Sequence, residues 1–76
     1  MPPAIHDPIL NPRALWRAMD RRGLDAPRLA AELDVSVRTI GSWLTGAVQP
    51  RPPTLILLAR VLDVEPSALR MQRPQQ

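Results

Sequence analysis

One short stretch combines residue types that could contact another molecule at close range. Residues 36–45 read SVRTIGSWLT, and helical spacing places Ile40 and Trp43 on one side of that stretch. The opposite side then carries small, polar or basic residues, namely Val37, Arg38, Gly41 and Ser42. A helix face that met only water would usually carry Glu, Lys or Gln, which favour the helix more strongly. These residues can make only non-covalent contacts: hydrogen bonds from a guanidinium and a hydroxyl, and a small apolar contact. Because their side chains are mostly short, we call this the thin face of the helix.

The residue sets that catalysis or metal binding needs are missing from the sequence. The chain of 76 residues has no cysteine, which excludes disulfides and thiol-based metal sites. Its single histidine, His6, has no second ligand candidate nearby. There is no Ser/His/Asp set, no glycine-rich phosphate loop and no pair of acids in a plausible cleft. We therefore expect no enzyme activity, no metal and no cofactor.

The placement of charge says more than its total. The formal net charge of +3 is only moderately basic, which by itself is a weak sign of an anionic partner. Residues 35–62, however, contain no acidic residue, while Arg38, Arg51 and Arg60 all fall within them. The longest apolar run, LILLA at 55–59, is too short to span a bilayer, and no secretion signal is visible. We expect a cytoplasmic protein.

The hydrophobic periodicity places the thin face on the third of five short helices, with no strand. The expected helices run from Pro12 to about Arg22, from Ala26 to about Leu33, over about 36–45, from Pro52 through Leu62, and from Glu65–Pro66 through Leu69. Asn11, Asp25 and Ser36 stand where side-chain N-caps are expected. Asp34 stands at a sharp turn, where aspartate tolerates a positive φ better than most residues.

The chain is short enough for one small domain. Residues 1–11 are expected to form an extended arm, residues 12–70 the domain, and residues 71–76 a flexible tail. Leu10 and Leu15 have the spacing of a hydrophobic staple at the start of the first helix.

Both tryptophans are expected in the core. Trp16, with Leu15 and Met19, forms the predicted inner face of the first helix, and Trp43 holds the third helix against the body.

The second and third helices are predicted to form a helix-turn-helix. A turn of three or four residues joins them, and Leu29–Ala30 packs under Ile40 and Trp43. This packing turns the thin face outward, so that the start of the third helix can enter a DNA major groove and meet base edges. The sequence therefore predicts double-stranded DNA as the partner. The predicted base-reading residues are Val37, Arg38, Gly41 and Ser42.

From residue 12 to residue 69 the chain resembles the lambda-repressor-like, Cro-type helix-turn-helix domains. The resemblance rests on LAAELDVS at 29–36, TIGSWLTG at 39–46, Pro50, LILLARVLDV at 55–64 and PSAL at 66–69. It implies an all-α, five-helix, lambda-repressor-like DNA-binding domain in a transcriptional regulator of prokaryotic or phage type, most of which act as repressors.

The resemblance also indicates which residues would hold the DNA backbone. By position, the phosphate-binding residues are Arg28, Ser36, Thr39, Thr45 and Arg51. Two alternatives stay open at this point: Arg38 could contact a base or a phosphate, and Arg51 could be plain surface.

The chain departs from the family pattern at three places. Asp34 replaces the usual glycine of the turn, at an expected cost of roughly 1 kcal/mol. Ala26 replaces a glutamine that often touches DNA. Met19 and Leu44 stand where many members have an Arg–Glu ion pair, so an apolar contact is expected there.

Surplus apolar residues point to a partner surface. Leu57, Val61 and Met71 add apolar surface beyond the core face, and a two-fold homodimer on a palindromic operator explains them most simply. The alternative is a small protein-interaction or antitoxin-like module that uses the same scaffold to bind a protein partner.

Overall fold

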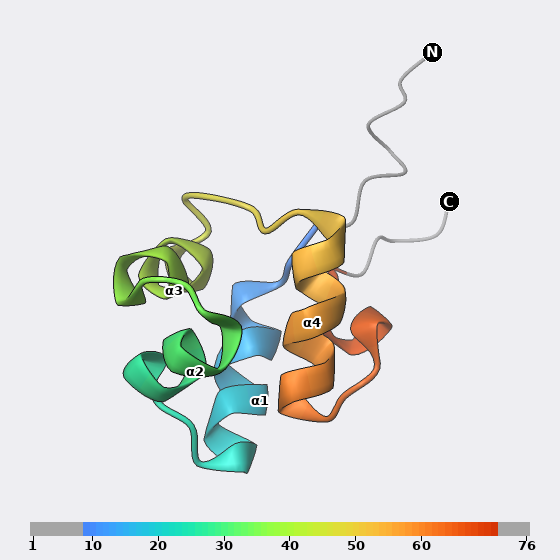
Figure 1. Ribbon diagram of the computed structural model, residues 1–76. Coiled ribbons are helices and arrows are strands. Elements are labelled where there is room, and N and C mark those ends of the chain that lie inside the picture. The colour runs from blue at the N-terminus through green and yellow to red at the C-terminus, as the bar shows by residue number, and fades with distance from the viewer. Residues whose placement is uncertain (1–8, 72–76) are drawn as a thin grey trace, which may run out of the picture.

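The computed structural model describes residues 9–71, which form four α-helices and one short 3-10 helix (Figure 1). The elements are α1 (Pro12–Arg22), α2 (Ala26–Leu33), α3 (Val37–Thr45), α4 (Pro52–Leu62) and η2 (Pro66–Leu69). The predicted all-α class is confirmed. None of these helices is long and apolar enough to cross a membrane.

The predicted count of five helices is slightly too high, because the last one is not an α-helix. The segment Pro66–Leu69 forms a single turn of 3-10 helix, and Arg70 after it is already extended. Arg70 is extended because it forms an antiparallel bridge with Leu10, and four residues are too few for a stable α-helix.

The first three helices begin at the predicted side-chain caps, whose oxygens accept from backbone amides in the first turn. The cap pairs are Asn11 Oδ1 with Arg13 N at 3.1 Å, Asp25 Oδ1 with Arg28 N at 3.0 Å, and Ser36 Oγ with Thr39 N at 3.1 Å. The fourth, α4, has no side-chain cap and begins with Pro52 and Pro53, whose missing N–H groups leave less to satisfy.

Two helices end at an aspartate in the left-handed conformation. The positive φ of Asp34, 58°, was predicted from the sequence, whereas the φ of Asp63, also 58°, was not. The residue after each aspartate, Val35 or Val64, donates its N–H to a carbonyl in the preceding helix, at 3.0 and 2.9 Å. These bonds satisfy carbonyls that the helix ends would otherwise leave free.

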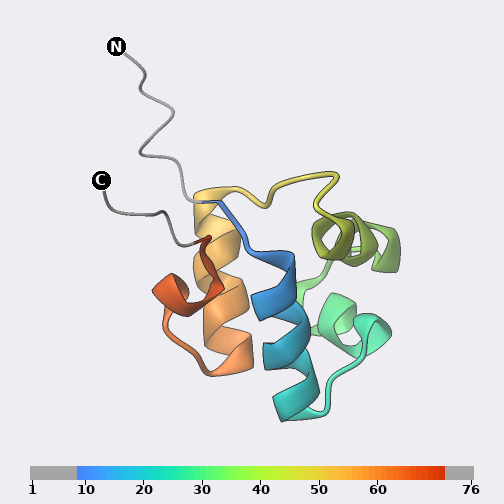
Figure 2. The same cartoon turned by 180° about the vertical axis from the view of Figure 1, so that it is seen from behind.

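Helix α1 lies at the centre of the molecule. It packs against α3 on one side and against α4 and η2 on the other, while α2 packs against both α3 and α4. The view from behind shows α1 between these two groups (Figure 2). Their buried side chains form one core, and within residues 9–71 it contains no polar or charged side chain: Leu10, Leu15, Ala18, Met19, Leu29, Ala30, Ile40, Trp43, Leu55, Leu58, Ala59, Leu62 and Leu69.

The prediction that Trp16 is part of the core is wrong. Its side chain is 56% exposed, whereas that of Trp43 is 4% exposed. The buried stripe of α1 is Leu15, Ala18 and Met19, spaced i, i+3 and i+4, so Trp16 falls on the edge of the helix that faces α3. Ala18 instead lies on the side of α1 that faces Val64 and Leu69, and the larger indole is left at the surface.

The two ends of the described chain lie side by side. Leu10 is buried and donates its N–H to Gln49 Oε1 at 2.8 Å. Asn11 N donates to Leu69 O and Met71 N donates to Ile9 O, each at 2.7 Å. The remainder of the predicted arm, including His6, and residues 72–76 of the predicted tail lie outside the described residues.

Candidate nucleic-acid interface

Helices α2 and α3 form the predicted helix-turn-helix. Leu29 and Ala30 of α2 are buried together with Ile40 and Trp43 of α3, and the two helices are in contact. The left-handed Asp34 ends α2 and reverses the chain within the short turn before the Ser36 cap of α3. The local caps and the shared core therefore hold α3 in one orientation on the body of the domain.

The outer face of α3 is open and thin. Val37 is 49% exposed, Arg38 is exposed, and Gly41 and Ser42 are partly exposed. A Cβ added at Gly41 would meet no atom within 4 Å, so the fold itself does not require glycine there. Because glycine costs roughly 1 kcal/mol in a helix interior relative to alanine, a close external contact is a better explanation of Gly41 than internal packing.

The hydroxyl groups along α3 are partly occupied by the helix itself. Ser42 Oγ donates to Arg38 O at 3.1 Å and Thr45 Oγ1 donates to Ser42 O at 3.2 Å. A hydroxyl has one hydrogen to donate and two lone pairs, so in this rotamer Ser42 can only accept from a bound molecule. Ser36 Oγ and Thr39 Oγ1 lie 2.9 Å apart, which fixes both side chains at the start of the helix.

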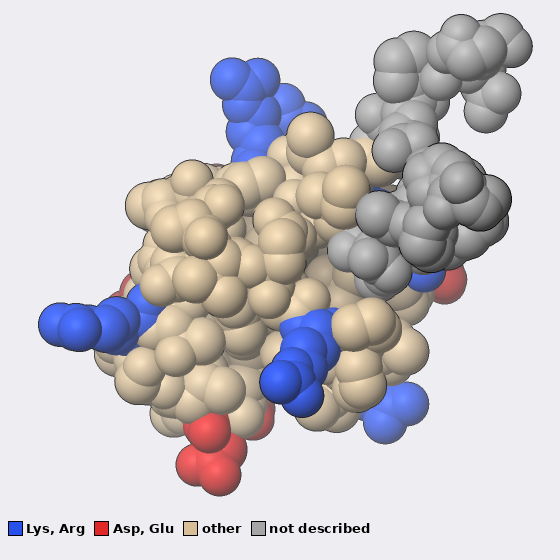
Figure 3. Space-filling view, turned by 90° about the horizontal axis from the view of Figure 1, so that it is seen from above, with Lys and Arg blue, Asp and Glu red and all other residues tan. Residues whose placement is uncertain are grey.

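The predicted phosphate-binding residues lie at three helix starts and on α3. Arg28, Ser36, Thr45 and Arg51 are exposed and Thr39 is partly exposed. Seen from above, the surface over α3 and the start of α4 shows no acidic side chain, and the red atoms lie at the margins (Figure 3). An anionic backbone would meet little repulsion along this side.

The loop after α3 is tied to two other parts of the molecule. Gly46 ends α3 with φ 82°, and Val48 N donates to Ser42 O at 3.3 Å. Gln49 accepts the Leu10 amide, as described above, and Pro50 is buried. These contacts set the position of Arg51 at the start of α4. The sequence offered no signal for the role of Gln49, because its partner lies 39 residues away.

Residues 17–69 match the helix-turn-helix family. The protein belongs to the helix-turn-helix family, in its lambda-repressor and Cro-like branch. The matched span runs from the middle of α1 to the end of η2, so it includes both helices of the motif. No well-characterised protein matches the sequence closely enough to be counted as a relative. Membership in this family implies DNA binding and a role in transcription regulation.

Positions 19 and 44, where many family members have an Arg–Glu ion pair, lie in an apolar region of this helix-turn-helix protein. Met19 is buried, Leu44 is partly buried, and both line one hollow together with Trp16 and Ala26. No buried charge is left unpaired here, because both members of the pair are apolar.

The predicted dimer residues of this helix-turn-helix protein lie on two separate elements. Leu57 is 48% exposed on α4, and Val61, one turn later, is partly buried against the core. Met71 instead lines a hollow with Trp16 and Leu44, to which no residue of α4 contributes. Ile56, also on α4, is 50% exposed and was not among the predicted dimer residues.

Proposed function

We propose that this protein is a sequence-specific transcriptional regulator that represses by binding a palindromic operator as a homodimer, with α3 in the major groove. The observation that carries the proposal is the outer face of α3. That face combines exposed Val37 and Arg38 with a glycine, Gly41, that the fold does not require. A helix face that contacted only solvent would carry residues that favour the helix more strongly than valine and glycine do.

Each residue of the α3 face has a distinct part in base reading. Arg38 presents its guanidinium to the O6 and N7 atoms of a guanine, and Val37 packs on a thymine methyl. Gly41 lets the base edges approach the helix backbone. Ser42, whose hydrogen is used by Arg38 O, accepts from the amino group of adenine or cytosine.

The phosphate contacts flank the base-reading face. Arg28 follows the start of α2 and Arg51 precedes α4, so each would neutralise a backbone phosphate at one edge of the site. Ser36 and Thr39 hold the first turn of α3, whose free amides also suit a phosphate. Thr45 completes the set at the end of α3.

The homodimer would form through α4. Leu57 and Val61 lie one turn apart on that helix, whereas the exposed Ile56 lies about 100° around it from Leu57. Met71 would contribute only if the partner also reaches the hollow beside Trp16. A two-fold dimer would place the two α3 helices about 34 Å apart, one turn of DNA. Such a regulator would act in the cytoplasm without a cofactor and without enzyme activity.

Selection of bound duplexes from a random pool, followed by sequencing, tests the proposal. Enrichment of one short palindrome supports a dimeric regulator. Enrichment that persists when Val37 and Arg38 are both changed to alanine would contradict base reading by α3. If no sequence is enriched, the alternative function takes precedence: a small interaction or antitoxin-like module that binds a protein through its exposed apolar residues, such as Leu57 and Ile56.

A further inference from the structure

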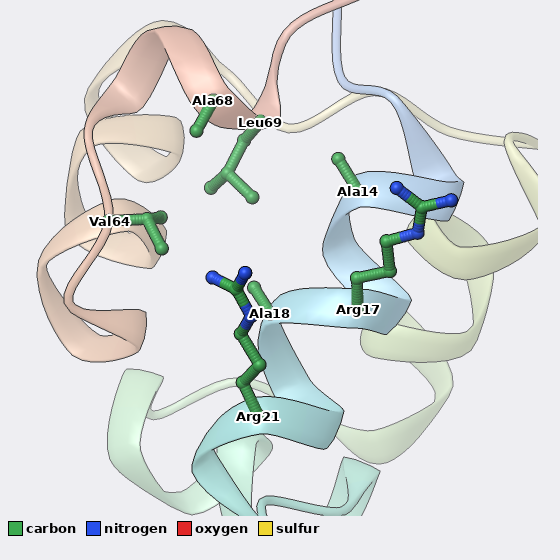
Figure 4. A pocket seen from close by; sticks show the side chains of 7 residues that line it. All are labelled: Ala14, Arg17, Ala18, Arg21, Val64, Ala68 and Leu69. Atoms are coloured by element: carbon green, nitrogen blue, oxygen red, sulfur yellow. The ribbon is translucent and has the colours of Figure 1, made fainter.

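A groove lies between α1 and η2 (Figure 4). It is on the side of α1 that faces away from α3 (Figure 2). Its volume is about 170 Å³. The lining residues come from α1 and from the segment that follows α4: Ala14, Arg17, Ala18, Arg21, Val64, Ala68 and Leu69. None of them belongs to the DNA-binding face proposed above.

The floor and far wall of the groove are apolar and small. Ala18 and Leu69 are buried, and Ala14 and Val64 are partly buried. A volume of about 170 Å³ is below the roughly 300–1,000 Å³ of typical small-molecule sites. It is large enough for one or two side chains, so its size fits a segment of another protein better than a cofactor.

Two arginines form the near wall. Arg17 and Arg21 are exposed and lie one helical turn apart on α1. Figure 4 shows the Arg21 side chain reaching past Ala18 into the space between α1 and the segment of Val64 and Leu69, whereas the Arg17 side chain runs along α1 to the level of Ala14, with its guanidinium turned away from Arg21. Asp20, the only acidic residue of α1, lines a different hollow, beside Trp16.

We propose that this groove binds an acidic amphipathic helix of a partner protein. Two carboxylates one turn apart on the partner, about 6 Å from each other, would match the spacing of Arg17 and Arg21 and could each accept paired hydrogen bonds. An apolar side chain next to them would enter the hollow over Ala18, between Val64 and Leu69. The site is independent of the proposed DNA contacts, since α1 separates it from α3.

The first test is the binding of a designed peptide to the full chain. The probe is a fluorescein-labelled helical peptide of about 20 residues made of Ala, Glu and Leu, with glutamates at i and i+4 beside a leucine stripe. Changing both Arg17→Gln and Arg21→Gln should weaken its binding roughly tenfold, because two exposed charge pairs are lost. The matched control, Arg13→Gln with Arg22→Gln, removes the same charge outside the groove and should leave the affinity nearly unchanged.

Four further experiments decide whether the groove itself is the site. In amide chemical-shift mapping, the largest changes should fall on Ala14, Ala18, Ala68 and Leu69; changes centred on α3, or spread over all arginines, overturn the proposal. A peptide with serine in place of leucine should bind more weakly, and equal binding would mean unspecific charge attraction only. Displacement of the peptide by scrambled duplex DNA would assign the arginines to nucleic acid. Ala68→Glu, at an exposed position, should repel the peptide while leaving operator binding intact, so the two proposals fail separately.

Discussion

Asp34 and Asp63 have the same left-handed backbone conformation, with φ 58° and ψ 46°, at the ends of α2 and α4. They close two similar local sequences, LAAELDV at 29–35 and LARVLDV at 58–64, which differ only at their third and fourth positions. In both sequences the valine after the aspartate donates to the carbonyl of the second residue of the motif, an alanine. The same seven-residue pattern therefore ends two helices, one leading into α3 and the other into η2.

Glycine at either aspartate is expected to stabilise the fold. A left-handed conformation is strained for residues with a Cβ, so Asp34→Gly and Asp63→Gly should each raise the free energy of unfolding by about 0.5–1 kcal/mol. The measurement is urea denaturation. As a control, Asp25→Ala removes a side-chain N-cap and should lower stability by about 1 kcal/mol. A loss of stability in Asp34→Gly would mean that the aspartate side chain holds the turn by a contact stronger than the strain.

The two tryptophans should respond very differently to truncation. Trp43→Ala opens a cavity in the core and should cost about 3–5 kcal/mol, whereas Trp16→Ala should cost no more than about 1 kcal/mol. In a Trp43→Phe protein, the fluorescence of Trp16 should resemble that of indole in water and be quenched readily by acrylamide. A blue-shifted, protected emission from Trp16 would show that a partner copy or another segment covers it in solution.

Gly41→Ala should separate stability from DNA binding. The added Cβ meets no atom of the protein within 4 Å, and alanine is the better helix former, so thermal stability should rise by up to about 1 kcal/mol. Operator affinity should nevertheless fall, and Gly41→Leu should lower it further. Asp63→Gly serves as the control, since it is expected to stabilise the protein at a helix end away from α3. Unchanged operator affinity in Gly41→Leu would place DNA on another surface.

Arg38 and Arg51 are expected to contact different parts of the DNA, Arg38 a base and Arg51 a phosphate. Arg38→Ala should cost roughly 1–3 kcal/mol per half-site on the operator and much less on a scrambled duplex. Arg51→Ala should weaken both duplexes alike and reduce the salt dependence by about one unit of slope. Arg22→Ala, which removes an exposed arginine at the end of α1, is the charge-matched control. Equal losses on both duplexes in Arg38→Ala would make Arg38 a phosphate contact.

A single change on α4 should separate the subunits of the proposed dimer. Leu57→Gln replaces a half-exposed apolar side chain, so the fold should persist while sedimentation shows a monomer with weakened operator binding. Ile56→Gln removes similar apolar surface about 100° around the same helix and should have less effect. A monomer already present at micromolar concentration in the unchanged protein would contradict the dimer.

Structural features that depend on residues close together in the sequence could be predicted from the sequence alone. The caps at Asn11, Asp25 and Ser36 bond to amides two or three residues away, so residue type and spacing were enough to predict where those helices begin. The helix-turn-helix followed from the same local rules together with the apolar spacing of α2 and α3. The left-handed Asp63 was also open to prediction, since its surroundings repeat those of Asp34.

Features that depend on distant parts of the chain were decided by the tertiary structure. Trp16 has helical spacing compatible with the core, but its exposure was set by which flank of α1 the other helices cover. Leu10 is buried because Gln49 and the strand-like pairing with Arg70 hold it in place. The same pairing keeps residue 70 extended and limits η2 to one turn. The groove with Arg17 and Arg21 exists only because η2 folds back against α1, a contact between segments far apart in sequence that helical periodicity does not encode.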